Sequence, residues 1–142
     1  MNNFNSDALK LENQLCFPLY AASKEVIRRY RPYLDALDLT YTQYIAMMVL
    51  WEKRSINVKE LGSLLYLDSG TLTPMLKSME AKNLINRTRS KNDERVVLVT
   101  ITTKGENLKK AAMQIPLKMS GCINLSPDEA IQLYSLLYKI LE

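Results

Sequence analysis

The sequence predicts a mainly helical fold with one small β-hairpin, and two observations lead to this prediction. The first is a set of four capping boxes, in which Ser, Thr or Asn is followed three residues later by Glu or Gln. This pairing satisfies N–H groups that are free at the start of a helix. The second is a β-rich stretch over residues 85–102, interrupted by polar and charged residues. The length of 142 residues suits one domain with a single core.

The first predicted helix is long and covers residues 7–33. Pro18 lies inside it, so we expect a bend at that position. Apolar side chains recur there at spacings of three and four, which places them on one helical face. This stripe consists of Leu11, Leu15, Leu19, Ala22, Val26 and Tyr30.

Four more helices are predicted to begin at the capping boxes. The boxes start at Thr40, Asn57, Thr103 and Ser126, and the helices cover residues 40–53, 57–65, 104–119 and 127–141. Pro127 follows the last box and suits the first position of a helix.

The middle of the chain has the element order of a winged helix-turn-helix. After the helix over 57–65, a tight connection leads to a helix over residues 69–82 with one apolar face. Strands over 84–89 and 96–101 then form a hairpin around a polar loop. Two helices and a hairpin in this order are typical of DNA-binding domains whose second helix enters the major groove.

The distribution of charge favours a nucleic-acid partner. The net charge is +4, and residues 53–95 carry nine cations and five anions, so this segment holds the whole excess. Charge alone decides little, because a charged run is more often a solvated surface. The start of the 69–82 helix adds short polar side chains and free N–H groups that favour phosphate.

Eleven residues are expected to form the DNA-binding surface. In the hairpin, Asp93 is expected to orient the Arg95 guanidinium, and the hairpin cations are expected to contact phosphates or enter the minor groove. The helix contributes Ser69, Gly70, Thr71, Thr73, Pro74 and Lys77, and the hairpin contributes Arg87, Arg89, Lys91, Asp93 and Arg95.

The composition argues against several classes of function. Histidine is absent, which excludes Ser-His-Asp and Cys-His catalysis and imidazole metal ligation. Cys16 and Cys122 lack the spacing of a metal site. We therefore expect no catalytic residues, no metal and no cofactor, and a protein that is not an enzyme. Apolar runs are too short to cross a bilayer and the N-terminus lacks a signal pattern, so we expect no membrane partner and a cytoplasmic location.

Four stretches resemble the MarR family of bacterial regulators, in its organic hydroperoxide resistance branch. They are LENQLCF at 11–17, LTYTQY at 39–44, LYLDSGTLTPMLK at 65–77 and NDER at 92–95. The resemblance implies a single MarR-type domain over 1–142, with a DNA-binding lobe at 40–102. It also implies a homodimer joined through helices at 7–35 and 104–142. Such a dimer represses from a pseudo-palindromic, inverted-repeat operator in double-stranded DNA until an organic peroxide or related oxidant acts.

One position departs from the pattern of this family. Its members often carry Arg directly after the position of Lys77, where this chain has Ser78. One DNA contact is therefore expected to be missing.

Cys16 is the candidate redox sensor, because its matching residues carry the sensing cysteine of that branch. Tyr30 lies fourteen residues further on, which is about 21 Å along a helix. Tyr30 therefore reaches Cys16 only across a two-fold axis, from the partner chain. The resemblance assigns the thiolate partners to Tyr30 and Tyr41 of the other subunit. Cys122 is either the thiol that resolves oxidised Cys16 or a bystander, in which case a small cellular thiol takes that part.

Other functions remain open at this point. One is a MarR-type regulator of general thiol stress or virulence, and another is a regulator released by a phenolic ligand, with Cys16 incidental. A thiol peroxidase is disfavoured because no Arg lies near Cys16 in the sequence to polarise an O–O bond. An architectural DNA-binding protein would bind weakly, without sequence preference and with a steep salt dependence.

Overall fold

The computed structural model describes residues 6–142 and contains seven α-helices, two short 3-10 helices and one three-stranded sheet. In chain order the elements are η1 (Ser6–Leu9), η2 (Leu11–Asn13), α1 (Cys16–Asp35), α2 (Tyr41–Lys53), β1 (Ser55–Asn57), α3 (Val58–Leu65), α4 (Ser69–Ala81), β2 (Ile85–Arg89), β3 (Val97–Ile101), α5 (Thr103–Ala112), α6 (Ile115–Ser120) and α7 (Pro127–Leu141). The predicted fold class, mainly helical with a β wing, is confirmed.

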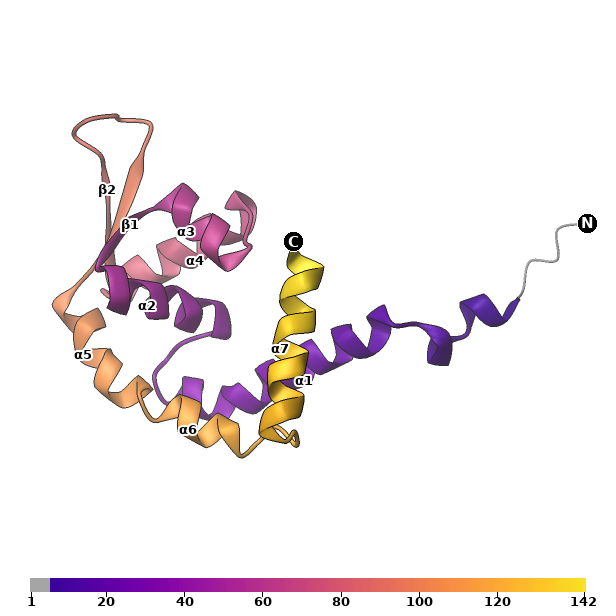
Figure 1. The fold of residues 1–142 in the computed structure, drawn as a ribbon. Coiled ribbons are helices and arrows are strands. Elements are labelled where there is room, and N and C mark those ends of the chain that lie inside the picture. The colour runs from indigo at the N-terminus through magenta and orange to yellow at the C-terminus, as the bar shows by residue number, and fades with distance from the viewer. Residues whose placement is uncertain (1–5) are drawn as a thin grey trace, which may run out of the picture.

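The core lies in a central lobe made by α2, α3, α4 and the sheet (Figure 1). β2 and β3 form the wing hairpin, which projects from this lobe. The largest fully buried side chains all come from these elements: Met47, Leu50, Leu61, Leu72, Leu76, Met79, Ile85 and Val99.

The expectation of one helix over residues 7–33 is wrong at its start. The α-helix begins only at Cys16, after two short 3-10 helices, and continues to Asp35. Pro18 therefore lies in the first turn, where backbone N–H groups have no helical acceptor and a missing one costs nothing. The bend expected at Pro18 does not arise, because Pro18 lies in the first turn of α1 rather than inside a longer helix.

The sequence also missed β1, which pairs with β3 and places it in the middle of the sheet. Its register sets Ile56 opposite Val99. β1 has three residues and one buried side chain, Ile56, so it carries too short a pattern to recognise.

The cap at the start of α5 differs from the predicted one by a single residue. Thr102, rather than Thr103, accepts the Gly105 N–H, at 3.1 Å. The predicted helix over 104–119 is also divided into α5 and α6, and Pro116 lies in the first turn of the second. A proline there disfavours a continuous helix through the preceding residues. The boxes at Thr40 and Ser126 are complete, as predicted.

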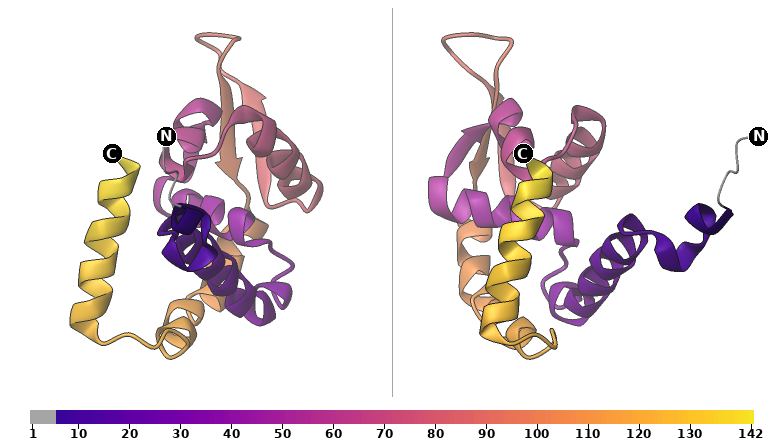
Figure 2. Two further views of the ribbon diagram at one scale, coloured as in Figure 1. Left: turned by 90° about the vertical axis from the view of Figure 1, so that its right-hand side faces the viewer. Right: turned by 45° about the vertical axis from the view of Figure 1, so that its right-hand side comes forward.

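Two segments lie apart from the lobe. None of the fifteen residues of α7 is buried, and α7 stands away from the α2–α4 layer in two views (Figures 1 and 2). In Figure 1 the start of α1 runs past α7 and away from the lobe. Both segments expose large apolar side chains, among them Leu15, Phe17, Ile131, Tyr134 and Ile140. Among residues 6–142, no helix is long and apolar enough to cross a membrane.

Candidate DNA-binding surface and cysteine sites

Helix α4 has one buried face and one face open to solvent. Asp68 begins it by accepting the Thr71 N–H at 2.8 Å. Leu72, Met75, Leu76 and Met79 anchor its inner face in the core. All six α4 residues predicted to contact DNA are exposed, so the structure brings them together on the outer face: Ser69, Gly70, Thr71, Thr73, Pro74 and Lys77.

The loop of the wing is organised around its charged residues. Arg95 donates from Nε and Nη2 to the Asp93 carboxylate, at 3.1 and 3.2 Å, while 91% of its side chain stays exposed. Hydrogen bonds from the Arg95 side chain, and then from its backbone N–H, lower the pKa of Asp93. Arg89 donates to the Glu94 carbonyl at 2.8 Å. With the exposed Lys91, these residues form a basic loop that is held open toward solvent.

Arg87 is placed differently from the other wing cations. Its backbone N–H and its Nη2 donate to the Glu80 carboxylate at 2.9 and 3.1 Å. These two bonds lower the pKa of Glu80. Only 24% of the Arg87 side chain is exposed, and its Nε is buried. The guanidinium joins the base of the wing to α4, and a DNA contact by Arg87 stays a prediction.

A groove of about 910 Å³ lies between the start of α4 and the wing. Lys59 and Tyr66 of the α3 region line one side, and Arg95 with Val97 lines the other. Asp68 and Ser69 contribute the start of α4. Of the residues expected to contact DNA, Ser69 and Arg95 line this groove.

Cys16 is the first residue of α1, and it is exposed. The residue before it, Leu15, makes no side-chain cap, so the first-turn N–H groups have no such acceptor. Anionic groups are favoured at a helix start of this kind.

The structure brings Tyr30 and Tyr41 together, with ring centroids 5.0 Å apart. Tyr44 completes the cluster at 5.9 Å from Tyr30 and 6.3 Å from Tyr41. Burial is the largest cause that raises the pKa of all three phenols, so they keep their protons and remain hydrogen-bond donors at neutral pH. The sequence did not single out Tyr44, although its spacing of three from Tyr41 places both on one face of α2.

Cys122 follows α6 and packs against the second half of α1. Its thiol donates to the Lys118 carbonyl at 3.3 Å, and its own carbonyl accepts from Arg29. Hydrogen bonding with Cys122 raises the pKa of Tyr33. Tyr33 lies seventeen residues after Cys16 on α1, or about 26 Å along the helix. The two cysteines of one chain are therefore far apart.

Comparison with known proteins places these features in context. A family model described as transcriptional regulator SarA/Rot matches residues 28–112. The organic hydroperoxide resistance transcriptional regulator of Bacillus subtilis strain 168 is 52% identical over 136 residues, covering 96% of this chain and 92% of that protein. These relatives are regulators of transcription rather than enzymes.

Solved structures of similar proteins include complexes with DNA. AbfR is a protein of Staphylococcus epidermidis. Its reduced form bound to DNA is 32% identical to this chain with a TM-score of 0.79, and the match covers 96% of this chain and 95% of that one. Overoxidised AbfR bound to DNA has the same identity and TM-score, whereas the disulfide form has a TM-score of 0.68 at 31% identity over both full chains. A mutant MarR from E. coli complexed with operator DNA has a TM-score of 0.82 at 29% identity, covering 90% and 94%.

Proposed function

Because the chain belongs to the MarR-type winged-helix transcriptional regulators, in the branch of the organic hydroperoxide resistance regulators, we propose that it is a dimeric repressor released from its operator by oxidation of Cys16. The signal is an organic hydroperoxide or a related oxidant. The observation that carries the proposal is the separation along α1 of an exposed cysteine, Cys16, from a cluster of buried and partly buried tyrosines at Tyr30. In the proposed dimer, the tyrosine cluster of the second subunit lies beside Cys16 of the first.

The exposed apolar segments support a homodimer. Ile131, Tyr134 and Ile140 of α7 are each more than 60% exposed, and Leu15 before α1 is 83% exposed. Side chains of this size stabilise a protein only when they leave water. In the proposed dimer, the terminal segments of the two chains cover one another, as a two-fold axis requires.

A two-fold axis between antiparallel α1 helices also completes the sensor. It sets Cys16 of one chain beside the tyrosine cluster of the other. The phenol protons of Tyr30 and Tyr41 are available to hydrogen-bond the thiolate, which is the reactive form of cysteine. Oxidation therefore changes contacts at the boundary between subunits.

The redox chemistry takes two steps. The Cys16 thiolate attacks the outer oxygen of the hydroperoxide, the O–O bond breaks, and the alkoxide leaves and is protonated to an alcohol. The sulfur becomes a sulfenic acid. A second thiol then attacks this sulfur, an S–S bond forms, and water leaves. The second thiol is Cys122 of the partner or a small cellular thiol.

Geometry restricts what Cys122 can do. A disulfide needs Cα atoms within about 7 Å, whereas Cys122 contacts Tyr33, about 26 Å along α1 from its own Cys16. Any disulfide between them therefore joins two subunits.

A binding assay tests the proposal with a DNA duplex selected from a random pool by the reduced protein. Cumene hydroperoxide is expected to weaken binding at least tenfold in the wild-type protein and not at all in Cys16→Ser. Unchanged binding of the oxidised wild-type protein would refute the proposal, as would a Cys16→Ser variant that still responds. Release of that variant by a phenolic compound favours the ligand-responsive alternative.

The fate of the sulfur is read separately by intact-mass measurement after mild oxidation. A reductant-sensitive covalent dimer, lost in Cys122→Ser, assigns the second step to Cys122. A monomer with an added small thiol assigns it to that thiol.

A further inference from the structure

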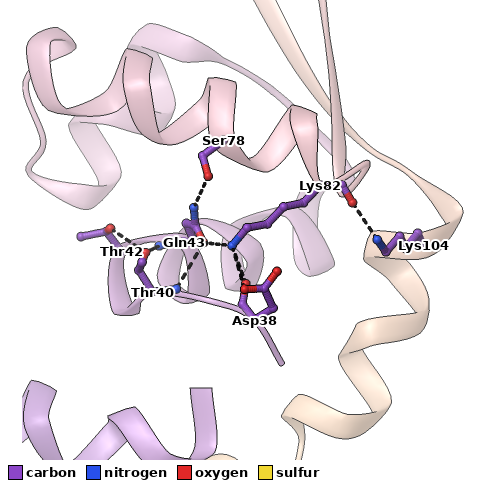
Figure 3. A network of polar contacts seen from close by, with 7 residues as sticks. All are labelled: Asp38, Thr40, Thr42, Gln43, Ser78, Lys82 and Lys104. Carbon is purple, nitrogen blue, oxygen red and sulfur yellow. Dashed lines mark hydrogen bonds and ion pairs between the residues drawn. The ribbon is translucent and has the colours of Figure 1, made fainter. Parts of the chain in front are cut away.

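Gln43, in the first turn of α2, is the one buried polar side chain among residues 6–142, with 4% of its surface exposed. Its amide oxygen accepts from the Thr40 N–H and from Lys82 Nζ, each at 3.2 Å. Its amide nitrogen donates to Ser78 Oγ at 3.1 Å (Figure 3). A buried amide with partners on both ends is held in one orientation, because each lost bond leaves a polar atom without water.

Ser78 and Lys82 belong to the last turn and the C-cap of α4. Lys82 is also fixed from other sides: its Nζ donates to the Asp38 carbonyl at 2.6 Å, and its carbonyl accepts from Lys104 of α5 at 2.8 Å. Figure 3 shows Gln43 between Ser78 and Lys82. Gln43, Ser78 and Lys82 are called the polar clamp below.

The turn of α2 that carries Gln43 also carries Tyr41 and Tyr44, which contact Tyr30 of α1. The first turn of α2 thus contributes to the tyrosine cluster and also contacts α4 through Gln43. Side chains of both helices also meet in the apolar core. Hydrogen bonds have preferred distances and angles, so the clamp fixes the register of the two helices.

We propose that Gln43 and Ser78 are positioning residues that set α4 against α2 and carry the state of the tyrosine cluster to the DNA-binding surface. The inference rests on the proposed function for its redox part. It also gives Ser78 a role: the half-buried hydroxyl contacts α2 rather than DNA.

The test compares Gln43→Met, Ser78→Ala, the double variant and the wild-type protein on the selected duplex. Ser55→Ala is the matched control, since that exposed hydroxyl joins β1 to Thr100 of β3 and does not line the groove beside α4. In the reduced state, Ser78→Ala is expected to weaken DNA binding more in the wild-type background than in the Gln43→Met background, by at least about twofold. Additive effects of the two substitutions would overturn the positioning role.

The redox part is read from the ratio of dissociation constants for oxidised and reduced protein. We expect at least about a tenfold ratio in the wild-type protein and in Ser55→Ala, and a ratio within about threefold of one in both clamp variants. Intact mass confirms equal oxidation of Cys16, and thermal melting confirms cooperative folding. A purely structural clamp weakens both states equally and leaves the ratio unchanged, which overturns the inference. A wild-type ratio near one instead refutes the proposed function and the redox part with it, while the reduced-state comparison still decides the positioning role.

Discussion

Gly105 is predicted to tolerate no side chain, because α5 passes very close to the end of α4 at this residue. A Cβ there would lie 2.4 Å from the Leu84 carbonyl oxygen and 2.8 Å from Ile101 Cγ1. The carbonyl cannot easily withdraw, since it accepts the Thr102 N–H at 3.1 Å. Gly105→Ala therefore forces a backbone shift between α5 and the base of the wing.

The magnitude follows from two opposed contributions. Overpacking costs about 3 kcal/mol when a backbone atom must move, and replacing Gly by Ala in a helix returns about 1 kcal/mol. We expect the free energy of unfolding to fall by about 2 kcal/mol, which lowers Tm by about 6 °C in a domain of this size.

Circular dichroism melts and urea titrations measure this change at one protein concentration, because the proposed dimer would make Tm concentration-dependent. Gly121→Ala is the control: its Cβ would lie 3.9 Å from the Lys118 carbonyl oxygen, and its φ of −81° suits Ala. It is expected to leave stability unchanged or slightly raised. Equal melting of wild-type and Gly105→Ala proteins would show that the close approach does not constrain the fold.

Three further predictions concern charge, pH and the aromatic contacts. Arg95→Ala is expected to weaken DNA binding severalfold and to reduce the salt slope by about one, with Lys110→Ala as an exposed control on α5; an unaltered slope rules out a phosphate contact at Arg95. Arg28 and Arg29 lower the pKa of Glu25 to about 2 by hydrogen bonding, so its stabilising contribution is complete above the usual pKa of 4.5 and lost as pH falls toward 2. An NMR titration midpoint near 4.5 would contradict this. Trp51→Phe removes the 2.9 Å bond to the Gly105 carbonyl and is expected to cost about 1 kcal/mol in urea unfolding; a cost near zero would mean that water replaces the bond.

Local chemistry explains which parts of the fold the sequence predicted well. The caps at Thr40 and Ser126 depend on residues three positions apart, and both form as expected. The predicted start of the first helix was wrong because the apolar spacing of three and four continues through Leu11 and Leu15. Both residues precede α1 and are exposed. Apolar side chains that face a partner chain and those that face their own core give the same pattern.

In the candidate site, too, local features could be predicted from the sequence and contacts between distant elements could not. The outer face of α4 follows from its helical period and was predicted residue by residue. The ion pair of Arg87 with Glu80 and the contact of Gln43 with Ser78 join different elements. Such pairs depend on the packing of the lobe, and a single sequence carries no signal for them. Only the capping role of Gln43 was visible, because its partner Thr40 is local.

The absence of buried residues from α7 has a consequence for how this protein works at low abundance. The lobe has a core of its own, whereas no residue of α7 is buried and the beginning of α1 exposes large apolar side chains. In the proposed dimer, association does three things at once: it covers these segments, completes the sensor and brings the α4 helices of two chains together. All three therefore depend on protein concentration. If the proposed dimer forms, dilution is expected to remove DNA binding and the proposed peroxide response together, so a cell with too few copies would lose both.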